Sequence, residues 1–334
     1  MNKKIAFFTP YYRSNRGNAT TTKRIVHGLE EAGIDVHVFP YLEERWNDEK
    51  EELVKECDLY HILHLYRFAR WNMCRELPLN KPYILTNGGT DINHDLANPA
   101  QLKEMKKMID GANAITVFTQ DGKEKVLNAY PNSLVEIIPQ SVWFENKQEL
   151  SIKFPDGKPV ILLPAGLRSV KDPLYVWNQI LDLKKKYTEL QFIIAGVVIE
   201  EEIEKQVLNL CNLYDWVHFF EDVPFSQMKA LYEQADITIN TSISEGQPSS
   251  IMEAMYCGCP VVVRNNEGNR SVVDHNKTGW IFNDEAEFEE IADRILSDHE
   301  RMSSVTKRAK EYILDHHSLE KEMNQYISLY SRLI

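Results

Sequence analysis

The stretch that decides the fold runs from residue 237 to residue 264 and places a polar turn and a helical pattern between two short apolar runs. It begins with Ile237-Thr-Ile-Asn-Thr-Ser242 and continues, two residues later, with Glu245-Gly-Gln-Pro-Ser-Ser-Ile-Met-Glu253. It ends in Pro260-Val-Val-Val-Arg264. A strand, a turn, a helix and a second strand in this order predict two parallel strands joined by a crossover helix.

The polar turn in this stretch has the features of an anion-binding site. A helix from about Ser249 to Cys257 would begin directly after the turn, with free N–H groups and the positive end of its dipole facing a ligand. Glu245 stands before the turn, at the carboxyl edge of the predicted sheet. Glu253 is predicted in the first helical turn, where it could reach hydroxyls on the molecule that carries the anion. The arrangement suits a sugar attached to a phosphate.

A helix cap is the alternative interpretation of the same residues. Ser250 and Glu253 have the spacing of a capping box, and acidic residues favour first turns on dipole grounds alone. The cap does not explain Glu245 and Gly246, and the two roles could coexist.

The alternation of short apolar runs and helical patterns extends over most of the chain. In residues 18–32, for example, Ile25, Val26 and Leu29 fall on one helical face. Strands that are apolar throughout predict parallel sheets covered by helices on both sides. The expected strands are Ile5–Thr9, Val36–Phe39, Leu59–Leu65, Tyr83–Thr86, Ala114–Thr119 and Leu134–Ile138 in the first half, and Val160–Pro164, Phe192–Ala195, Val217–Phe220, Ile237–Thr241, Val261–Val263 and Trp280–Phe282 in the second.

A polar segment without a clear period, Trp143–Lys158, divides these two sets of strands and predicts a linker. With 334 residues the chain is long enough for two domains. We therefore predict an α/β protein with an N-terminal domain of residues 1–145 and a C-terminal domain of residues 155–315. The helical tail, residues 316–334, would pack back on the first domain. Such sheets bind ligands at the carboxyl ends of their strands, so two facing domains would share one cleft.

Composition narrows the function classes. A net charge of −12 disfavours nucleic acid as a partner, which would need a basic face. The N-terminal apolar run is too short for a signal peptide, and no stretch approaches the roughly 20 apolar residues of a membrane helix. The five scattered cysteines indicate reduced thiols in a cytoplasmic protein, although a local patch could still dock on a membrane. Cys257-x-Cys259 lacks a second ligand pair, so no metal site is predicted.

Two loops after strands of the second half carry candidate nucleotide-binding residues. The first is Ala165-Gly-Leu-Arg168-Ser-Val-Lys171, in which an arginine fork and a lysine point charge could hold a diphosphate. A solvated basic loop is the alternative. The second is Glu221-Asp-Val223-Pro224, where a backbone group at Val223 could contact a nucleobase edge.

The first half offers weaker candidates at the same positions after strands. Gly17 permits close approach of the backbone and Asn18 could cap the following helix, although an ordinary capped turn explains both. One glycine does not make the dinucleotide fingerprint. His64 ends a predicted strand and would face the cleft, in a catalytic or a structural role, and Asn87-Gly-Gly-Thr-Asp91 is a polar loop suited to sugar or phosphate.

With these motifs the chain resembles the retaining nucleotide-sugar glycosyltransferases of family four, which have the GT-B fold of two doubly wound, Rossmann-like domains. The similarity is strongest over residues 160–282. It is carried by Glu245-Gly-x-Pro-x-Ser-x-x-Glu253-Ala, by Cys257-Gly-Cys-Pro-Val-Val-Val263, by Thr278-Gly-Trp-Ile-Phe282, and by Arg168 with Lys171. The wording Gly166-Leu-Arg-x-Val-Lys-Asp-Pro173 is similar to the branch of "glycosyltransferase 1 domain-containing" proteins.

The resemblance implies a role for each candidate residue. Arg168 and Lys171 would bind the donor diphosphate, Glu253 the ribose hydroxyls, and Glu245 the donor sugar near its anomeric carbon. Family members usually need no metal, because these cations and the helix dipole replace one. The segment Gly246-Gln247-Pro248-Ser249-Ser250 would add contacts to the donor through its backbone N–H groups, which all of these residues except Pro248 possess. Gly17 and Asn18 would contact the donor from the other domain.

The chain also departs from the family pattern. Many members have Thr-x-His-Gly-x-Asp where this chain has Thr86-Asn-Gly88-Gly-Thr-Asp91, so Gly88 stands in place of a histidine. Leu167 separates the glycine from Arg168, and Gly17-Asn18 replaces a glycine pair. These departures leave the diphosphate site in place and concern the acceptor side and His64.

Three hypotheses follow. The first is a cytoplasmic, metal-independent and cofactor-free retaining transferase that moves a hexose-type sugar from a UDP- or GDP-sugar to a saccharide, lipid-linked or protein acceptor. The second is a nucleotide-sugar epimerase or a phosphorylase on the same plan. The third is a non-catalytic nucleotide-sugar-binding protein or subunit, which Gly88 favours. Acceptor choice would depend on the loops 11–16 and 66–75, whose aromatic residues Tyr11, Tyr12, Tyr66, Phe68 and Trp71 could stack on a sugar or belong to the core.

Overall fold

The computed structural model describes residues 3–89, 91–96, 98–145 and 153–334. The chain divides into two compact units: unit 1 contains residues 1–141 and 319–334, and unit 2 contains residues 142–318. The prediction from the sequence was an N-terminal domain that ends at residue 145, a C-terminal domain of residues 155–315 and a helical tail that starts at residue 316. Part of the expected linker, residues 146–152, lies outside the described residues.

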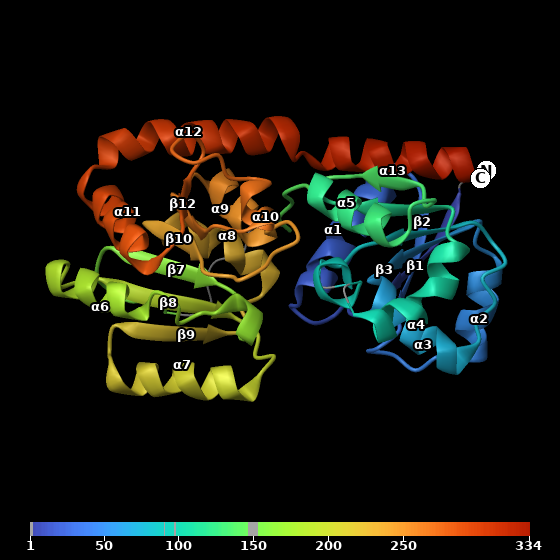
Figure 1. Cartoon of the computed structure of the whole chain (residues 1–334), viewed down its shortest axis with the longest axis horizontal. Helices are drawn as coiled ribbons and strands as arrows, with labels where there is room; N and C mark the ends of the chain where they lie inside the picture. Colours follow the sequence, from blue (N-terminus) through green and yellow to red (C-terminus); the bar gives the residue numbers. More distant parts are fainter. Residues whose placement is uncertain (1–2, 90, 97, 146–152) are drawn as a thin grey trace. The chain divides into compact units, whose positions relative to one another are not determined.

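Unit 1 is built on a parallel sheet that has six strands among the described residues, in the order β2-β1-β3-β4-β5-β6 (Figure 1). Its strands are β1 Lys4–Thr9, β2 Asp35–Pro40, β3 Leu59–Leu63, β4 Tyr83–Thr86, β5 Ala114–Val117 and β6 Val135–Ile137. Its helices are α1 Gly17–Glu31, α2 Asp48–Lys55, α3 Leu65–Arg75, a π-helical turn Asp91–Asp95, α4 Pro99–Asp110, α5 Gln120–Ala129 and α13 Leu319–Leu333.

Helices cover both faces of the unit 1 sheet. Successive residues of a strand point to opposite faces, so alternate residues of β1 contact different helices. Ile5 and Phe7 pack with α1 and α13, whereas Ala6 and Phe8 pack with α2, α3, α4 and α5. The C-terminal helix α13 is held by a buried ion pair in which the Arg24 guanidinium contacts both carboxylate oxygens of Glu322, at 2.9 and 3.1 Å.

Unit 2 repeats this plan with strand order β12-β11-β10-β7-β8-β9, again six parallel strands in its described part (Figure 1). Its strands are β7 Val160–Pro164, β8 Gln191–Gly196, β9 Val217–Glu221, β10 Ile237–Asn240, β11 Val261–Arg264 and β12 Trp280–Phe282. Its helices are a 3₁₀ turn Ser169–Lys171, α6 Trp177–Lys186, α7 Glu201–Leu213, α8 Phe225–Gln234, α9 Ser249–Cys257, α10 Glu267–Arg270, α11 Glu285–Ser297 and α12 His299–His316. Helices α6, α7 and α11 cover one face and α8, α9 and α12 the other.

The predicted α/β architecture of two doubly wound parallel sheets is confirmed. Several strands are shorter than expected: β5 ends at Val117, β6 covers only Val135–Ile137, and β10 ends at Asn240. Strand β3 ends at Leu63 because His64 adopts a left-handed backbone conformation, with φ of 68°, and α3 starts at the next residue. Three of the five aromatic residues proposed for acceptor binding belong to the core or pack against it, and one of them is the partly buried Tyr66. Phe68 is fully buried, and Trp71 packs against it with the ring centroids 5.5 Å apart.

Candidate functional site

The loops that follow β7 and β10 are joined to each other at the carboxyl edge of the unit 2 sheet. The N–H of Ile243 donates to the carbonyl of Val170 at 2.9 Å, and the Thr241 hydroxyl donates to the carbonyl of Lys171 at 2.9 Å. Strands β7 and β10 are neighbours in the sheet, which brings the two loops together. The lysine loop and the Glu245 turn therefore form one connected platform.

Lys171 and Glu245 form an ion pair at the centre of this platform. The Lys171 Nζ lies 2.5 Å from Oε1 of Glu245, and the side chains are only 17% and 10% exposed. The same oxygen accepts hydrogen bonds from Asn240 Nδ2 at 2.9 Å and from Ser242 Oγ at 2.7 Å. Burial opposes the charge of Glu245, but the Lys171 charge and these hydrogen bonds outweigh it and lower the pKa of Glu245. The carboxylate is thus held ionised in a nearly dry setting.

An asparagine cluster fixes the turn on its other side. Asn266 caps α10 by accepting from the N–H of Asn269 at 2.9 Å, and its own amide donates to the carbonyl of Ser242 at 2.9 Å. Asn269 Nδ2 donates to Asn240 Oδ1 at 3.2 Å. Because Asn240 also holds Glu245, the cluster positions the carboxylate.

Gly268, in α10, lies directly against the backbone of Glu245. A Cβ built on Gly268 would lie 2.5 Å from the Cβ of Glu245 and 2.6 Å from its carbonyl oxygen. Real Cβ atoms do not approach backbone atoms this closely, so only glycine fits here without a shift of the turn.

Helix α9 begins at Ser249 with Pro248 as its N-cap residue, which overturns the capping-box interpretation. Glu253 lies in the second turn and not in the first, and it accepts a hydrogen bond from the Tyr232 hydroxyl at 2.8 Å. Both side chains are buried. Burial raises the pKa of Tyr232 well above its usual value, and the Glu253 carboxylate adds to the shift, so the hydroxyl remains a donor.

The segment from Gly246 to Ser250 leads into the N-terminus of α9. Gln247 and Pro248 are buried, whereas Ser249 and Ser250 are partly exposed. The first N–H groups of a helix have no acceptor within the helix, so the serine end of α9 offers donors to a ligand.

Arg168 and Val223 lie at the same edge of the sheet, in the loops after β7 and β9, which strand β8 separates. Arg168 precedes the 3₁₀ turn that ends at Lys171, and it is partly exposed. Val223 is buried beyond the end of β9, next to Asp222, whose left-handed backbone donates to the carbonyl of Gly196 at 3.2 Å. A Cβ on Gly196 would collide with the carbonyl of Ala165, so close packing of β8 on the lysine loop also requires glycine.

In unit 1, Gly17 is the first residue of α1 and the N-cap residue is Arg16, without a side-chain cap. The prediction that Asn18 caps this helix is therefore wrong, because Asn18 already lies inside it. A Cβ on Gly17 would meet open space, whereas a Cβ on Gly88 would lie 3.2 Å from Asn18 Oδ1.

His64 fills the space beside Gly88. A Cβ on Gly88 would lie 2.8 Å from His64 Cδ2, so a larger residue at position 88 and the imidazole in its present place exclude each other. His64 is buried, and its Nδ1 lies 3.8 Å from Asp91 Oδ2. Asp91 accepts backbone N–H bonds from Leu65, Gly88 and Ile92, and burial raises its pKa to about 6 against these bonds.

The platform in unit 2 lies within a region that matches a known protein family. Residues 144–312, just over half of the chain, match the family described as glycosyl transferases group 1. The matched region contains the Lys171–Glu245 pair and Glu253. The chain belongs to this family.

Named relatives of this glycosyl transferase cover more of its length. Glycosyltransferase 1 domain-containing protein 1 of Xenopus tropicalis is 28% identical to it, over 96% of this chain and 96% of the relative. Sucrose-phosphate synthase from Thermosynechococcus elongatus has a TM-score of 0.78 at 16% identity, covering 99% of both chains. HepE from Anabaena in complex with UDP-glucose has a TM-score of 0.76 at 16% identity, covering 99% of this chain and 100% of the other. The two solved structures confirm the GT-B fold, and the Xenopus tropicalis relative confirms the resemblance to glycosyltransferase 1 domain-containing proteins.

The two units divide the predicted site residues of the glycosyl transferase between them. Unit 2 holds those expected at the donor, and within it the structure brings Lys171 and Glu245 into contact while placing Glu253 against Tyr232. Unit 1 holds Gly17, Asn18 and His64, of which Asn18 and His64 both border Gly88.

Sequence reasoning missed several positioning residues in this glycosyl transferase. Tyr232, Asn240, Asn266 and Gly268 all position one of the two glutamates, directly or through the turn. The only available signal was Asn266-x-x-Asn269 after the strand at 261–264, which has the spacing of a helix N-cap.

Two kinds of feature are absent from the described residues. No described helix of the glycosyl transferase is long and apolar enough to cross a membrane. In the same part of the chain, no group of three or more His, Cys, Asp or Glu side chains is placed to hold a metal ion.

Proposed function

We propose that this glycosyl transferase moves a hexose-type sugar from a UDP- or GDP-sugar to an acceptor hydroxyl, with retention of the anomeric configuration and without a metal or other cofactor. The observation that carries the proposal is the Lys171–Glu245 pair, a nearly buried cation and carboxylate joined on one platform beside the start of α9. The acceptor would be a saccharide, a lipid-linked molecule or a protein.

The donor would bind along the carboxyl edge of the unit 2 sheet. Arg168 and Lys171 would contact the diphosphate, and the N–H groups at the start of α9 would add donors to the same anion. Glu253 would accept from the ribose hydroxyls, and the backbone near Val223 would contact the base. Unit 1 would contribute Gly17 and Asn18 to donor binding and His64 to catalysis.

Charge development explains why these groups accelerate transfer. The bond between the anomeric carbon and the phosphate oxygen breaks, and its electron pair passes to the departing diphosphate. Fixed cations and N–H donors in a site with little water stabilise that charge, by a few kcal/mol for each good donor. The acceptor oxygen bonds to the same face of the sugar, and its proton passes to an oxygen of the leaving phosphate. Glu245 would orient the sugar and offset its positive charge.

A structural neighbour supports the choice of donor, and the cysteines support a cellular location. HepE, which shares the fold, has been solved in complex with UDP-glucose and with UDP. We also propose a cytoplasmic location, which the free cysteines Cys57, Cys74, Cys211, Cys257 and Cys259 support, since thiols persist in reducing compartments.

Nucleotide binding tests the proposal first. UDP or GDP should raise the melting temperature of the purified protein in buffer that contains EDTA, because the protein's own cations replace a metal. A panel of nucleotides and sugar nucleotides read by thermal shift would also identify the base. Absence of a shift with every nucleotide would refute the donor site.

Product analysis then separates transfer from the alternatives. With a UDP- or GDP-sugar and an acceptor panel, NMR should show a product whose anomeric configuration matches the donor. Isomerised donor without an acceptor would instead indicate an epimerase, and binding without turnover would indicate a non-catalytic protein.

Ribose recognition by Glu253 gives a second prediction. Glu253→Gln keeps an oxygen for the Tyr232 hydroxyl but removes the charge, so the preference for UDP over 2′-deoxy-UDP should fall about tenfold, as expected for a hydrogen bond to a charged group. Isothermal titration with the two nucleotides measures this ratio.

The matched control for this ratio is Tyr232→Phe, which keeps the carboxylate and loses only the hydroxyl. Because the Tyr232 hydroxyl positions Glu253, the variant's preference for UDP should fall, but less than that of Glu253→Gln, which removes the charge. If Glu253→Gln weakens both nucleotides by the same factor, Glu253 does not contact the ribose.

A further inference from the structure

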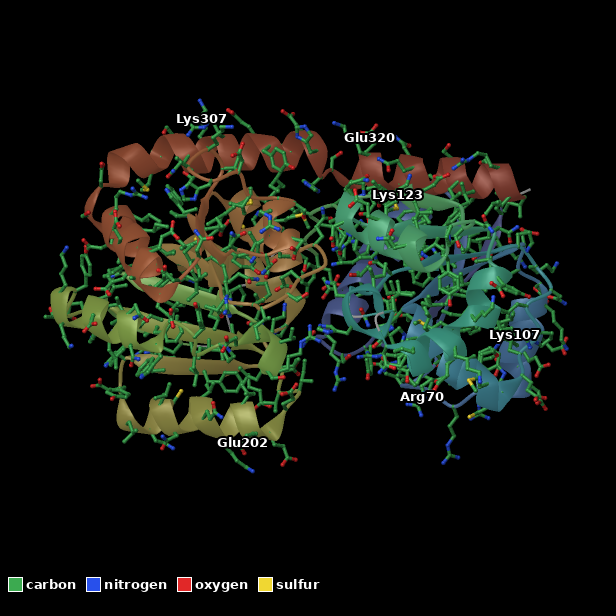
Figure 2. The ribbon with its side chains drawn as sticks, viewed as in Figure 1. Arg70, Lys107, Lys123, Glu202, Lys307 and Glu320 are labelled. Carbon is green, nitrogen blue, oxygen red and sulfur yellow. The ribbon has the colours of Figure 1, made fainter. Side chains whose placement is uncertain are left out.

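Arginines gather at the carboxyl edge of the unit 1 sheet, in a chain whose net charge is −12. Arg13 and Arg16 lie in the loop after β1, and Arg67 and Arg70 lie in the first two turns of α3. Strands β1 and β3 are neighbours, so the two segments start side by side. We call these four residues, with Tyr11 and Tyr66, the arginine patch; Figure 2 labels Arg70 on α3.

The guanidinium groups lie over the tyrosine rings. The Cζ atoms of Arg16 and Arg67 are 4.5 and 5.4 Å from the ring centroid of Tyr11, and the Cζ of Arg70 is 6.0 Å from that of Tyr66. These contacts hold the planar groups in place on rigid rings, which reduces the entropy lost when a ligand binds.

The four charges are not equally neutralised. Arg13 pairs with Glu44 at 2.7 Å, and Arg70 Nε lies 3.8 Å from a carboxylate oxygen of Glu104. Within the described residues, Arg16 and Arg67 have no carboxylate within ion-pair distance, although the charge of Arg67 acts on the carboxyl of Asp95, whose pKa burial raises to about 6. Two like charges against one ring repel each other, and an anion bound between them would remove that cost.

The position of Arg67 adds to this excess. It is the third residue of α3, near the positive end of the helix dipole, and the first turn contains no acidic residue to balance it. Cations are unfavourable at that end of a helix, whereas a bound anion is favourable there.

The loop that carries Arg13 and Arg16 is held in shape by Glu43. Its carboxylate accepts the backbone N–H groups of Tyr12 at 2.8 Å, Arg13 at 2.9 Å and Ser14 at 3.2 Å. Burial opposes the charge of Glu43, but these hydrogen bonds outweigh it and lower the pKa of Glu43, so its carboxylate remains ionised. The patch is therefore preorganised, and Glu43 is already occupied by the backbone.

We propose that the arginine patch binds a phosphate group carried by the acceptor. Arginine forks match phosphate geometry, and the two guanidiniums that form no ion pair within the described residues lie on rigid rings at a ligand-binding edge. The inference rests on the proposed function, in which the donor diphosphate is bound by Arg168, Lys171 and α9 of unit 2. The arginines of unit 1 are therefore available to bind the acceptor, which is the second substrate of the transfer.

The test uses the whole protein saturated with UDP, so that the donor site is occupied. Glucose 6-phosphate and N-acetylglucosamine 1-phosphate, each paired with its neutral sugar, serve as soluble probes by titration. Phosphatidylcholine vesicles with and without phosphatidic acid serve as the lipid probe by cosedimentation. A phosphorylated probe should bind in one arm while its neutral counterpart does not, and the arm that responds identifies a soluble or a lipid-linked acceptor.

Variants then locate the binding site. Arg16→Gln and Arg67→Gln should each weaken the phosphorylated probe about tenfold, the usual effect of losing a charged hydrogen bond, with UDP affinity unchanged. Arg75→Gln, an exposed position at the end of α3, is the matched control and should bind normally.

Three results would overturn the inference. Failure of all phosphorylated probes to bind, while UDP still binds, refutes it and leaves the proposed function intact. Equal loss of UDP and phosphate binding in the Arg16 and Arg67 variants assigns the patch to the donor instead. Failure of UDP to bind the wild-type protein refutes the proposed function, and this inference with it.

Discussion

Replacing Lys171 with alanine should abolish the nucleotide-dependent thermal shift and lower kcat/KM by about 10²–10³-fold, the range found when one preorganised donor at a developing negative charge is removed. Lys171 is the cation joined to Glu245 at 2.5 Å, and both side chains are almost buried. Its loss removes positive charge from the diphosphate and leaves the carboxylate without its ionic partner. Thermal shift with UDP and steady-state kinetics measure the two effects.

The same variant should change the dependence of stability on pH. In the wild type the pKa of Glu245 is below 4.5, so the pair stabilises the fold above that pH and its contribution is lost as the pH falls through the lowered pKa. Without Lys171, burial acts against the charge with less opposition, and the variant should be about 3–5 kcal/mol less stable near neutral pH. The difference from the wild type should shrink on acidification, measured by urea unfolding across a pH series.

A surface pair provides the control for Lys171. Lys185 lies 2.5 Å from Asp182, but the two side chains are 77% and 47% exposed. Lys185→Ala removes an ion pair of equal length that water screens, so stability and nucleotide binding should stay close to those of the wild type. If Lys171→Ala resembled Lys185→Ala in binding and stability, the Lys171–Glu245 pair would not be part of a donor site.

Replacing Gly268 with alanine should lower kcat by about 10²-fold, the cost that a displacement near 1 Å can have at a reacting centre. The added methyl group would meet the Cβ and carbonyl oxygen of Glu245 at 2.5 and 2.6 Å, so the turn must move. No charge changes, and Lys171 remains, so the affinity for UDP should fall much less than kcat. Kinetics and UDP titration on the same preparation measure this split.

Glu267→Ala is the control for Gly268→Ala, because it changes the preceding, exposed residue of α10 without adding a group against Glu245. It should retain normal kcat, and circular dichroism should show that both variants are folded. A Gly268→Ala enzyme with unchanged kcat would mean that the exact position of Glu245 is unimportant for transfer.

The sequence predicted those features that depend on neighbouring residues. Uniformly apolar runs separated by helical patterns were sufficient to predict both parallel sheets. Each strand of such a sheet is buried on both faces, so all of its residues tend to be apolar. The sequence also predicted that Lys171 and Glu245 would share one sheet edge, since β7 and β10 both end there.

Features set by tertiary contacts could not be predicted in the same way. Tyr232 lies 21 residues before Glu253, and nothing in either segment indicates that the hydroxyl would reach the carboxylate. Local spacing favoured a Ser250–Glu253 capping box. In the structure, Pro248 is the N-cap residue, so Glu253 lies in the second turn of the helix. The requirement for glycine at 268 appears only when α10 is placed against the Glu245 turn.

The buried Arg24–Glu322 pair has a consequence for how the polypeptide can be cut and recombined. Unit 1 needs residues from both ends of the chain, and Glu322 also accepts from the N–H and hydroxyl of Ser141. A fragment that stops at residue 141 would leave Arg24 without its carboxylate partner and would expose the apolar face of the sheet that α13 covers. Chimeras that exchange unit 1 must therefore carry α13 together with residues 1–141, joined at two splice points.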